Sequence, residues 1–76
     1  MKTNIIYTNN ILTVYFSGGI RKRSLNSFKK KLFNIVDEYQ IDNIVFDLSN
    51  SAISDDLNFL IEDYSKRYNN EIRIIQ

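Results

Sequence analysis

Two amphipathic helical patterns, each set between runs of β-branched residues, constrain the fold of this chain more than any other feature. In both patterns, most apolar residues recur at intervals of three or four positions, the spacing of one face of an α-helix. The first pattern consists of Leu25, Phe28, Leu32, Ile35, Val36 and Tyr39. The second consists of Leu57, Leu60, Ile61, Tyr64 and Tyr68. Ser24 and Ser54 come just before these patterns and are the predicted N-caps.

The β-prone runs span residues 5–8, 11–16, 44–46 and 72–75. Asn9 and Asn10 separate the first two runs, and Asn tolerates positive φ, so we predict a two-residue hairpin turn there. The second run is apolar on both faces and the third does not alternate. We therefore expect both of these strands to be covered on both sides. Residues 47–53 are predicted to form a polar loop, and Asn69-Asn70 to end the second helix.

These patterns predict one α/β domain over residues 1–76, with the element order β-β-α-β-α-β and a mixed sheet of about four strands. Right-handed crossovers would place the helices on one face of the sheet or divide them between its faces. Functional sites in such sheets lie at the carboxyl ends of the parallel strands. Here those ends lead into residues 18–23 and 48–55.

Composition removes most enzyme classes. The 76 residues include no histidine and no cysteine, which excludes Ser-His-Asp chemistry, a thiol nucleophile and the usual zinc ligands. No apolar run approaches the ~18 residues of a membrane span, and no signal-peptide core follows Met1-Lys2. We expect a cytoplasmic protein without membrane insertion, without a cofactor and without catalytic activity.

The charges are divided between the two halves of the sequence. Residues 1–36 carry seven Lys and Arg and no acid, whereas residues 37–76 carry nine acids against three basic residues, so +7 and −6 give the net +1. One interpretation is steering toward an acidic partner or nucleic acid. The other is a basic helix lying beside an acidic helix in the fold. Within the second helix, Glu62 with Lys66 and Asp63 with Arg67 are predicted to pair at i,i+4 spacing.

Three segments together resemble one family. Residues 11–20 read as a strand followed by Ser-Gly-Gly-Ile, residues 44–50 read Ile-Val-Phe-Asp-Leu-Ser-Asn, and residues 64–75 read as a helix end followed by a strand. In this order the chain resembles, over nearly its whole length, a STAS domain, the module of bacterial anti-sigma-factor antagonists. The match at Asp47-Leu48-Ser49-Asn50 is the most telling.

The resemblance implies regulation of transcription through protein–protein interaction. Such domains bind a partner that is often a kinase-like anti-sigma factor, and a serine in an Asp-Ser-Ser-Gly motif at the start of the second helix is their phosphorylation switch. Aligned forward from Asp47, the motif falls on Asp55, Asp56, Leu57 and Asn58, so Asp56 stands at the switch serine. The chain also has Arg21-Lys22-Arg23 where the family often has acids, and it stops at its fourth strand, whereas typical members continue through another helix and strand.

The predicted docking surface lies at the start of the second helix, with the glycine loop beside it. Its residues are Ser51, Ser54, Asp55, Asp56, Asn58, Gly18, Gly19 and Arg21. With Asp at the switch, we expect a binding state that serine phosphorylation does not control. The alternative interpretation is that Asp55 and Asp56 are ordinary carboxylates at a helix N-terminus, where they favour the helix dipole.

Two other functions stay open. The basic half predicts a nucleic-acid or phosphate-binding module with contacts from Arg21, Lys22, Arg23, Lys29 and Lys30. The last strand, from Ile72 to Ile75, is an uncovered edge that predicts a homodimer or another self-associating structural role. A Mg²⁺ site built from Asp47, Asp55 and Asp56 is a weaker alternative, because no nucleophile or partner lysine accompanies it. Exposed aromatic residues among Phe33, Phe59, Tyr7 and Tyr15 would mark an interface.

Overall fold

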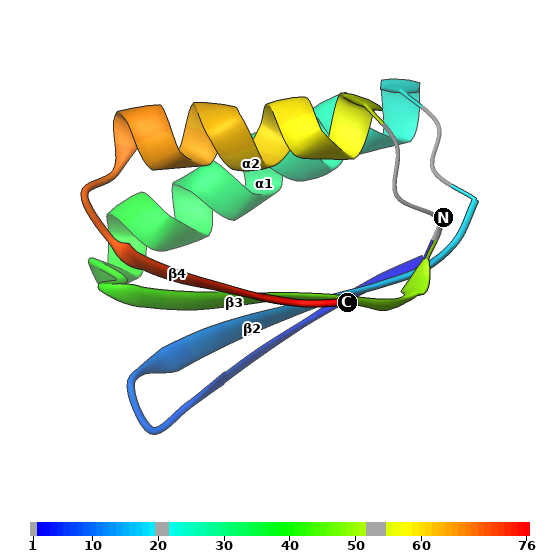
Figure 1. The fold of residues 1–76 in the computed structure, drawn as a ribbon. Coiled ribbons are helices and arrows are strands. Elements are labelled where there is room, and N and C mark those ends of the chain that lie inside the picture. The colour runs from blue at the N-terminus through cyan, green and yellow to red at the C-terminus, as the bar shows by residue number, and fades with distance from the viewer. Residues whose placement is uncertain (1, 20–21, 52–54) are drawn as a thin grey trace.

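The computed structural model describes residues 2–19, 22–51 and 55–76 and confirms the predicted order of elements. Its elements are β1 (Lys2–Thr8), β2 (Ile11–Gly18), α1 (Lys22–Tyr39), β3 (Asn43–Ser51), α2 (Asp55–Arg67) and β4 (Glu71–Ile75). Figure 1 shows a layer of two helices packed on a single sheet. Within these ranges, no helix combines the length and the apolar composition that crossing a membrane requires.

The sheet has four strands in the order β1-β2-β3-β4. β1 runs antiparallel to β2, whereas β2, β3 and β4 are parallel to one another. Both crossovers step in the same direction across the sheet. A right-handed connection then places both helices on the same face, as Figure 1 shows.

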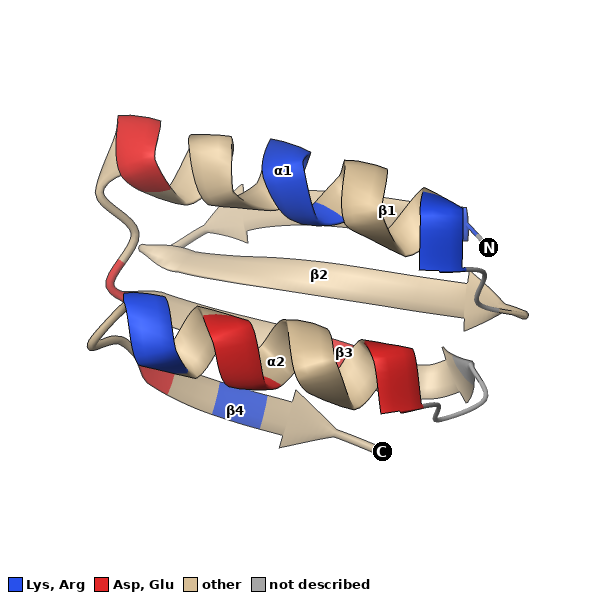
Figure 2. Cartoon of the chain, turned by 90° about the horizontal axis from the view of Figure 1, so that it is seen from above, with Lys and Arg blue, Asp and Glu red and all other residues tan. Residues whose placement is uncertain are grey.

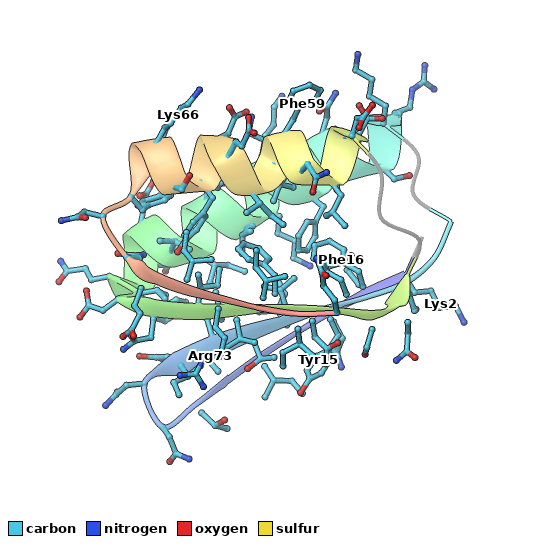
Figure 3. The ribbon with its side chains drawn as sticks, viewed as in Figure 1. Lys2, Tyr15, Phe16, Phe59, Lys66 and Arg73 are labelled. Atoms are coloured by element: carbon cyan, nitrogen blue, oxygen red, sulfur yellow. The ribbon has the colours of Figure 1, made fainter. Side chains whose placement is uncertain are left out.

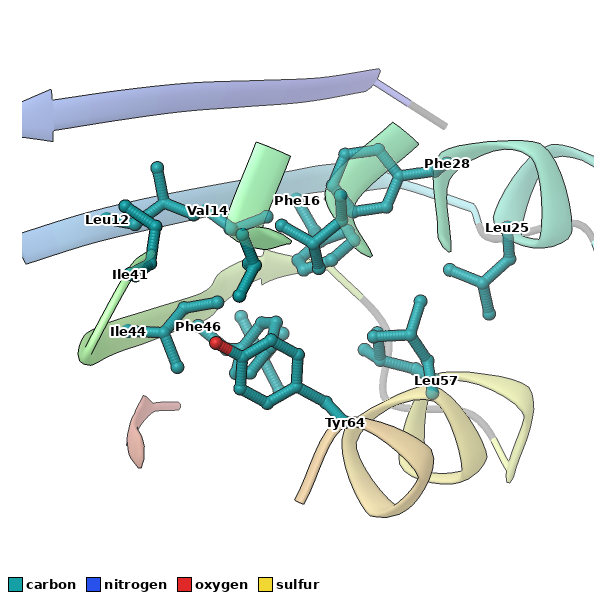
Figure 4. Close-up of a cluster of buried hydrophobic side chains, with 14 residues drawn as sticks. Leu12, Val14, Phe16, Leu25, Phe28, Ile41, Ile44, Phe46, Leu57 and Tyr64 are labelled. Atoms are coloured by element: carbon teal, nitrogen blue, oxygen red, sulfur yellow. The ribbon is translucent and has the colours of Figure 1, made fainter. Parts of the chain in front are cut away.

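The core lies between the helices and this one sheet face. Strand residues that alternate along the chain point into it, such as Leu12, Val14 and Phe16 of β2. Edge-to-face aromatic contacts join the layers: the ring centroids of Phe16 and Phe28 are 5.3 Å apart, and those of Phe46 and Tyr64 are 5.6 Å apart. Figure 4 shows these side chains converging from both helices and the central strands.

The other sheet face is uncovered, so the prediction that residues 11–16 and 44–46 are covered on both sides is wrong. Ile11 and Tyr15 are 38% and 39% exposed, and Val45 is only half-buried. In Figure 3, Tyr15 and Arg73 lie on the side of the sheet away from the helices, opposite Phe16. Packing within the domain therefore does not explain why this face carries apolar residues.

The hairpin turn is confirmed. Asn9 and Asn10 have φ values of 53° and 64°, the pair of positive angles that a type I′ turn requires. A further positive φ, 50° at Gln40, follows the last residue of α1 and ends that helix in the left-handed conformation.

Four local predictions are corrected. α1 begins at Lys22, so Ser24 lies inside its first turn and is not the N-cap. Tyr39, predicted on the core face, is the last residue of α1 and is 59% exposed, so the buried face of this helix ends at Val36. The polar loop predicted from residue 47 begins later, because β3 continues to Ser51 beside the long strand β2, with Leu48 buried. α2 ends at Arg67, before the predicted Asn69-Asn70.

Candidate functional site

The described residues on either side of the two predicted loops lie at one end of the domain. There the carboxyl ends of β2 and β3 lie beside the first turns of α1 and α2 (Figures 1 and 2). Gly18 and Gly19 are exposed, and Gly18 has a φ of 80°. A Cβ atom added at either glycine would meet nothing within 4 Å, so a close contact is not the reason for glycine at these two positions. The positive φ is a reason for glycine at position 18 only. Arg21 and Ser54 lie outside the described residues, and Ser51 is the last residue of β3.

A groove of about 160 Å³ runs between the helices, lined by residues of α1 and α2. Its apolar lining includes the buried residues Leu25 and Leu60. Lys29 and Asp63 form an ion pair across it, one residue from each helix. The other lining residues are Lys22, Asn26, Asp56 and Phe59.

Phe59 is the most exposed of the large hydrophobic side chains in the described ranges, at 60% of its surface. It lies in α2 one turn after Asp55 and one turn before Asp63, on the helix face opposite the buried Leu57 and Tyr64. Figure 3 shows it on the outer side of α2, away from the sheet. Tyr7 and Tyr15 are also exposed, whereas Phe33 is half-buried against Tyr64 and Tyr68.

Ion pairs of both polarities link the two helices, with the cation on α1 in one pair and on α2 in the other. Besides Lys29–Asp63, Arg67 of α2 lies 3.4 Å from Asp37 of α1, and the Tyr68 hydroxyl donates a 2.7 Å hydrogen bond to Asp37. The predicted pairing of Asp63 with Arg67 inside α2 is therefore wrong, because each side chain reaches α1 instead. The hydrogen bond from Lys29 lowers the pKa of Asp63. Burial raises the pKa of the Tyr64 phenol, against the opposing effect of a hydrogen bond from Asn70.

Three other cations of α1 lie together on its surface. Lys22, Arg23 and Lys30 surround a shallow depression of about 450 Å³ together with Asn26 and Ser27. No ion pair links these three cations to any residue in the described ranges. Lys29 does not belong to this basic surface, because it faces α2. The charge division in the sequence is thus only partly compensated within the fold (Figure 2).

Asp47 lies away from the other candidate residues. It pairs with Tyr15 and Ile75 in the sheet and belongs to the uncovered face. Its carboxylate accepts hydrogen bonds from the Ser49 backbone N–H at 3.0 Å and from the Ser49 hydroxyl at 2.6 Å, which lower its pKa. Asp55 and Asp56 lie in the first turn of α2 instead. Across residues 2–19, 22–51 and 55–76, no group of three or more acidic, histidine or cysteine residues is placed to hold a metal ion.

Comparison with known proteins gives no family assignment. No protein-family model matches the chain, and a search of curated proteins finds no match. Functional inference therefore depends on the fold and on the side chains at the helix starts.

Proposed function

We propose that this chain is a non-catalytic interaction module of the anti-sigma-factor-antagonist type, which binds a kinase-like protein or another regulatory protein. The docking surface comprises the first turns of α2 with the adjoining groove, and we call it the α2 docking surface. Its residues are Lys22, Asp55, Asp56, Phe59 and Asp63; Asn58 lies on the opposite flank of α2 and is not part of it. The observation that carries this proposal is the exposed side chain of Phe59.

An exposed phenylalanine at this position does not contribute to the core. Aromatic anchors surrounded by polar groups are typical of the centres of protein interfaces, where they supply much of the binding energy. The partner should therefore offer an apolar pocket for Phe59. Because Asp55 and Asp63 lie one turn on either side of it, that pocket should carry basic residues at its rim.

The second part of the proposal concerns control. Asp56 is half-buried in the first turn of α2, where a carboxylate is favoured by the helix dipole. A permanent carboxylate at the aligned switch position would hold the surface in one binding state. Phosphorylation of Ser51 or Ser54 in cells would contradict this part of the proposal.

Affinity capture from the native host tests the proposal. The tagged chain, Phe59→Ala and Tyr39→Ala are compared at low and moderate salt, with mass spectrometry of the bound proteins. Tyr39 is the matched control, because it is an aromatic residue as exposed as Phe59, at 59%. It lies at the end of the helix layer away from the α2 docking surface. We expect a kinase-like or sigma-regulatory protein with the unaltered chain and with Tyr39→Ala, and its loss with Phe59→Ala. Equal recovery by all three chains would contradict the assigned surface.

The basic surface of α1 supports a second candidate function, binding of nucleic acid or another phosphate-bearing ligand. Three cations around an acid-free depression form a favourable site for phosphate groups. Lys30→Glu should weaken such binding, whereas Lys66→Glu, on the outer side of α2 in Figure 3, should not. Retention of nucleic acid at low salt, its release as salt rises and its loss in Lys30→Glu would favour this function over the first.

A further inference from the structure

β4 forms one edge of the sheet, and no strand in the described ranges pairs with its outer side. The Glu71 backbone N–H donates to Asp42 at 3.0 Å, on the side of β3. Backbone groups of successive residues point to opposite sides of a strand. The N–H and C=O groups of Ile72 and Ile74 therefore point outward, away from β3. Such an edge is a template for another strand.

The described residues beside this edge on the helix side are uncharged. Ile72 is half-buried against the core, and Ile74 is 44% exposed. Asp56, Asp63 and Arg67 of α2 face α1, so by the 100° rotation per helical residue the opposite flank faces outward above β4. That flank consists of Asn58, Ile61 and Ser65, none of which is charged. Figure 2 shows β4 lying outside α2 along this flank.

We propose that β4 pairs antiparallel with β4 of a second copy of this chain, across a two-fold axis perpendicular to the sheet. The pairing joins two four-stranded sheets into one continuous sheet. It supplies partners for the outward backbone groups of both edges. It also covers Ile72 of each copy with Ile72 of the other.

The charges of β4 define the register. Glu71 and Arg73 lie on the uncovered face of the sheet, on either side of Ile72. An antiparallel pairing centred on Ile72 sets Glu71 opposite Arg73 of the second copy, and does so twice by symmetry. A pairing centred on Arg73 would instead set two arginines directly opposite each other, which is unfavourable. The strand is thus complementary to itself in the first register.

This charge pattern favours a second copy as the occupant of the edge. The opposite edge, β1, has Lys2 as its one charged residue and offers no opposite charges to set a register with itself. The β4 edge also lies on the flank of α2 away from the groove. A dimer through β4 therefore leaves the α2 docking surface accessible, and the two proposals can fail independently.

Sedimentation velocity of the purified chain over a wide concentration range at moderate salt tests the dimer and its register. The variants are Glu71→Arg, Arg73→Glu and the double exchange Glu71→Arg/Arg73→Glu, with Lys66→Glu as a charge reversal away from the edge. We expect a concentration-dependent dimer for the unaltered chain and for Lys66→Glu. Each single exchange turns two attractive cross-strand pairs into repulsive ones and should weaken dimerisation roughly tenfold or more. The double exchange should restore it to within about threefold, because the pairs are re-formed in reverse order.

Circular dichroism and urea unfolding establish that each variant is folded, which is expected because Glu71 and Arg73 are exposed. A monomer at the highest concentration would overturn the dimer. Unchanged dimerisation of Glu71→Arg would overturn the register, because within β4 only the pairing centred on Ile72 sets Glu71 opposite an arginine. A double exchange as weak as the single ones would overturn it as well.

Discussion

Lys29 of α1 donates a hydrogen bond from its ammonium group to the Asp63 carboxylate of α2, and this ion pair links the two helices across the groove beside Phe59. Both side chains are partly exposed, so the pair serves to position the helices more than to stabilise the fold. Its loss should be visible in the pH dependence of stability.

Asp63→Asn should reduce stability at neutral pH by a small amount that disappears in acid. The pKa of Asp63 is lowered in the folded state, so its charge stabilises the fold above the unfolded-state pKa of about 3.9. That contribution is lost as pH falls through the lower folded-state pKa. Urea unfolding at pH 7 and near pH 3 measures the difference between Asp63→Asn and the unaltered chain. Glu62→Gln, which removes a neighbouring exposed carboxylate, is the control, and a difference that grows toward pH 3 would contradict the assignment.

Asn70→Ala should destabilise the fold far more than Asn69→Ala. The Asn70 amide donates hydrogen bonds to the Ile41 carbonyl at 2.7 Å and to the Tyr64 hydroxyl at 2.8 Å. Its removal leaves the hydroxyl of the fully buried Tyr64 without that donor, so we expect a loss of about 1–3 kcal/mol. Asn69 is exposed, and its replacement should change the free energy of unfolding by less than about 0.5 kcal/mol. Equal effects in chemical denaturation would contradict this role of Asn70.

The hairpin turn offers a test in both directions. Asn10 has a φ of 64°, a conformation that glycine adopts without cost and β-branched residues adopt poorly. Asn10→Gly should therefore leave stability unchanged or raise the melting temperature, whereas Asn10→Val should cost about 1–2 kcal/mol. Thermal unfolding followed by circular dichroism measures both, and a valine variant as stable as the glycine variant would contradict the turn type.

Two phenylalanines should behave in opposite ways when truncated. Phe46 is fully buried, so Phe46→Ala should cost about 3–5 kcal/mol. A domain of 76 residues has only about 4–11 kcal/mol of stability in total, and this variant should be largely destabilised. Phe59→Ala should change stability by less than about 0.5 kcal/mol, because the side chain is mostly in water. A large loss with Phe59→Ala would mean that Phe59 supports the fold and is not a docking residue.

The order of elements, the hairpin turn and the core positions of both helices could be predicted from the sequence because each is a local pattern. The exposure of one whole face of the sheet could not be predicted in this way. Ile11, Tyr15 and Val45 are as apolar as core residues, and only the direction of the two crossovers decides which face the helices cover.

Among candidate site residues, the sequence analysis singled out the start of α2 and the basic first half, and these remain predictions. It did not distinguish the roles of Lys29 and Lys30, which are adjacent in sequence but lie on different sides of α1. Pairing partners such as Asp63 for Lys29 are separated by 34 positions, so no local pattern indicates them. Phe59 was out of phase with the core pattern, which was the available signal for its exposure.

Photo-crosslinking from position 59 in the native host is the most direct test of Phe59 as a docking residue. Phe59 is replaced by a photoreactive phenylalanine analogue, and Tyr39 is replaced in the same way in a parallel strain. We expect a covalent adduct of position 59, but not of position 39, with one kinase-like or sigma-regulatory protein. Adducts of position 59 with nucleic acid alone, or protein adducts formed only at position 39, would contradict it.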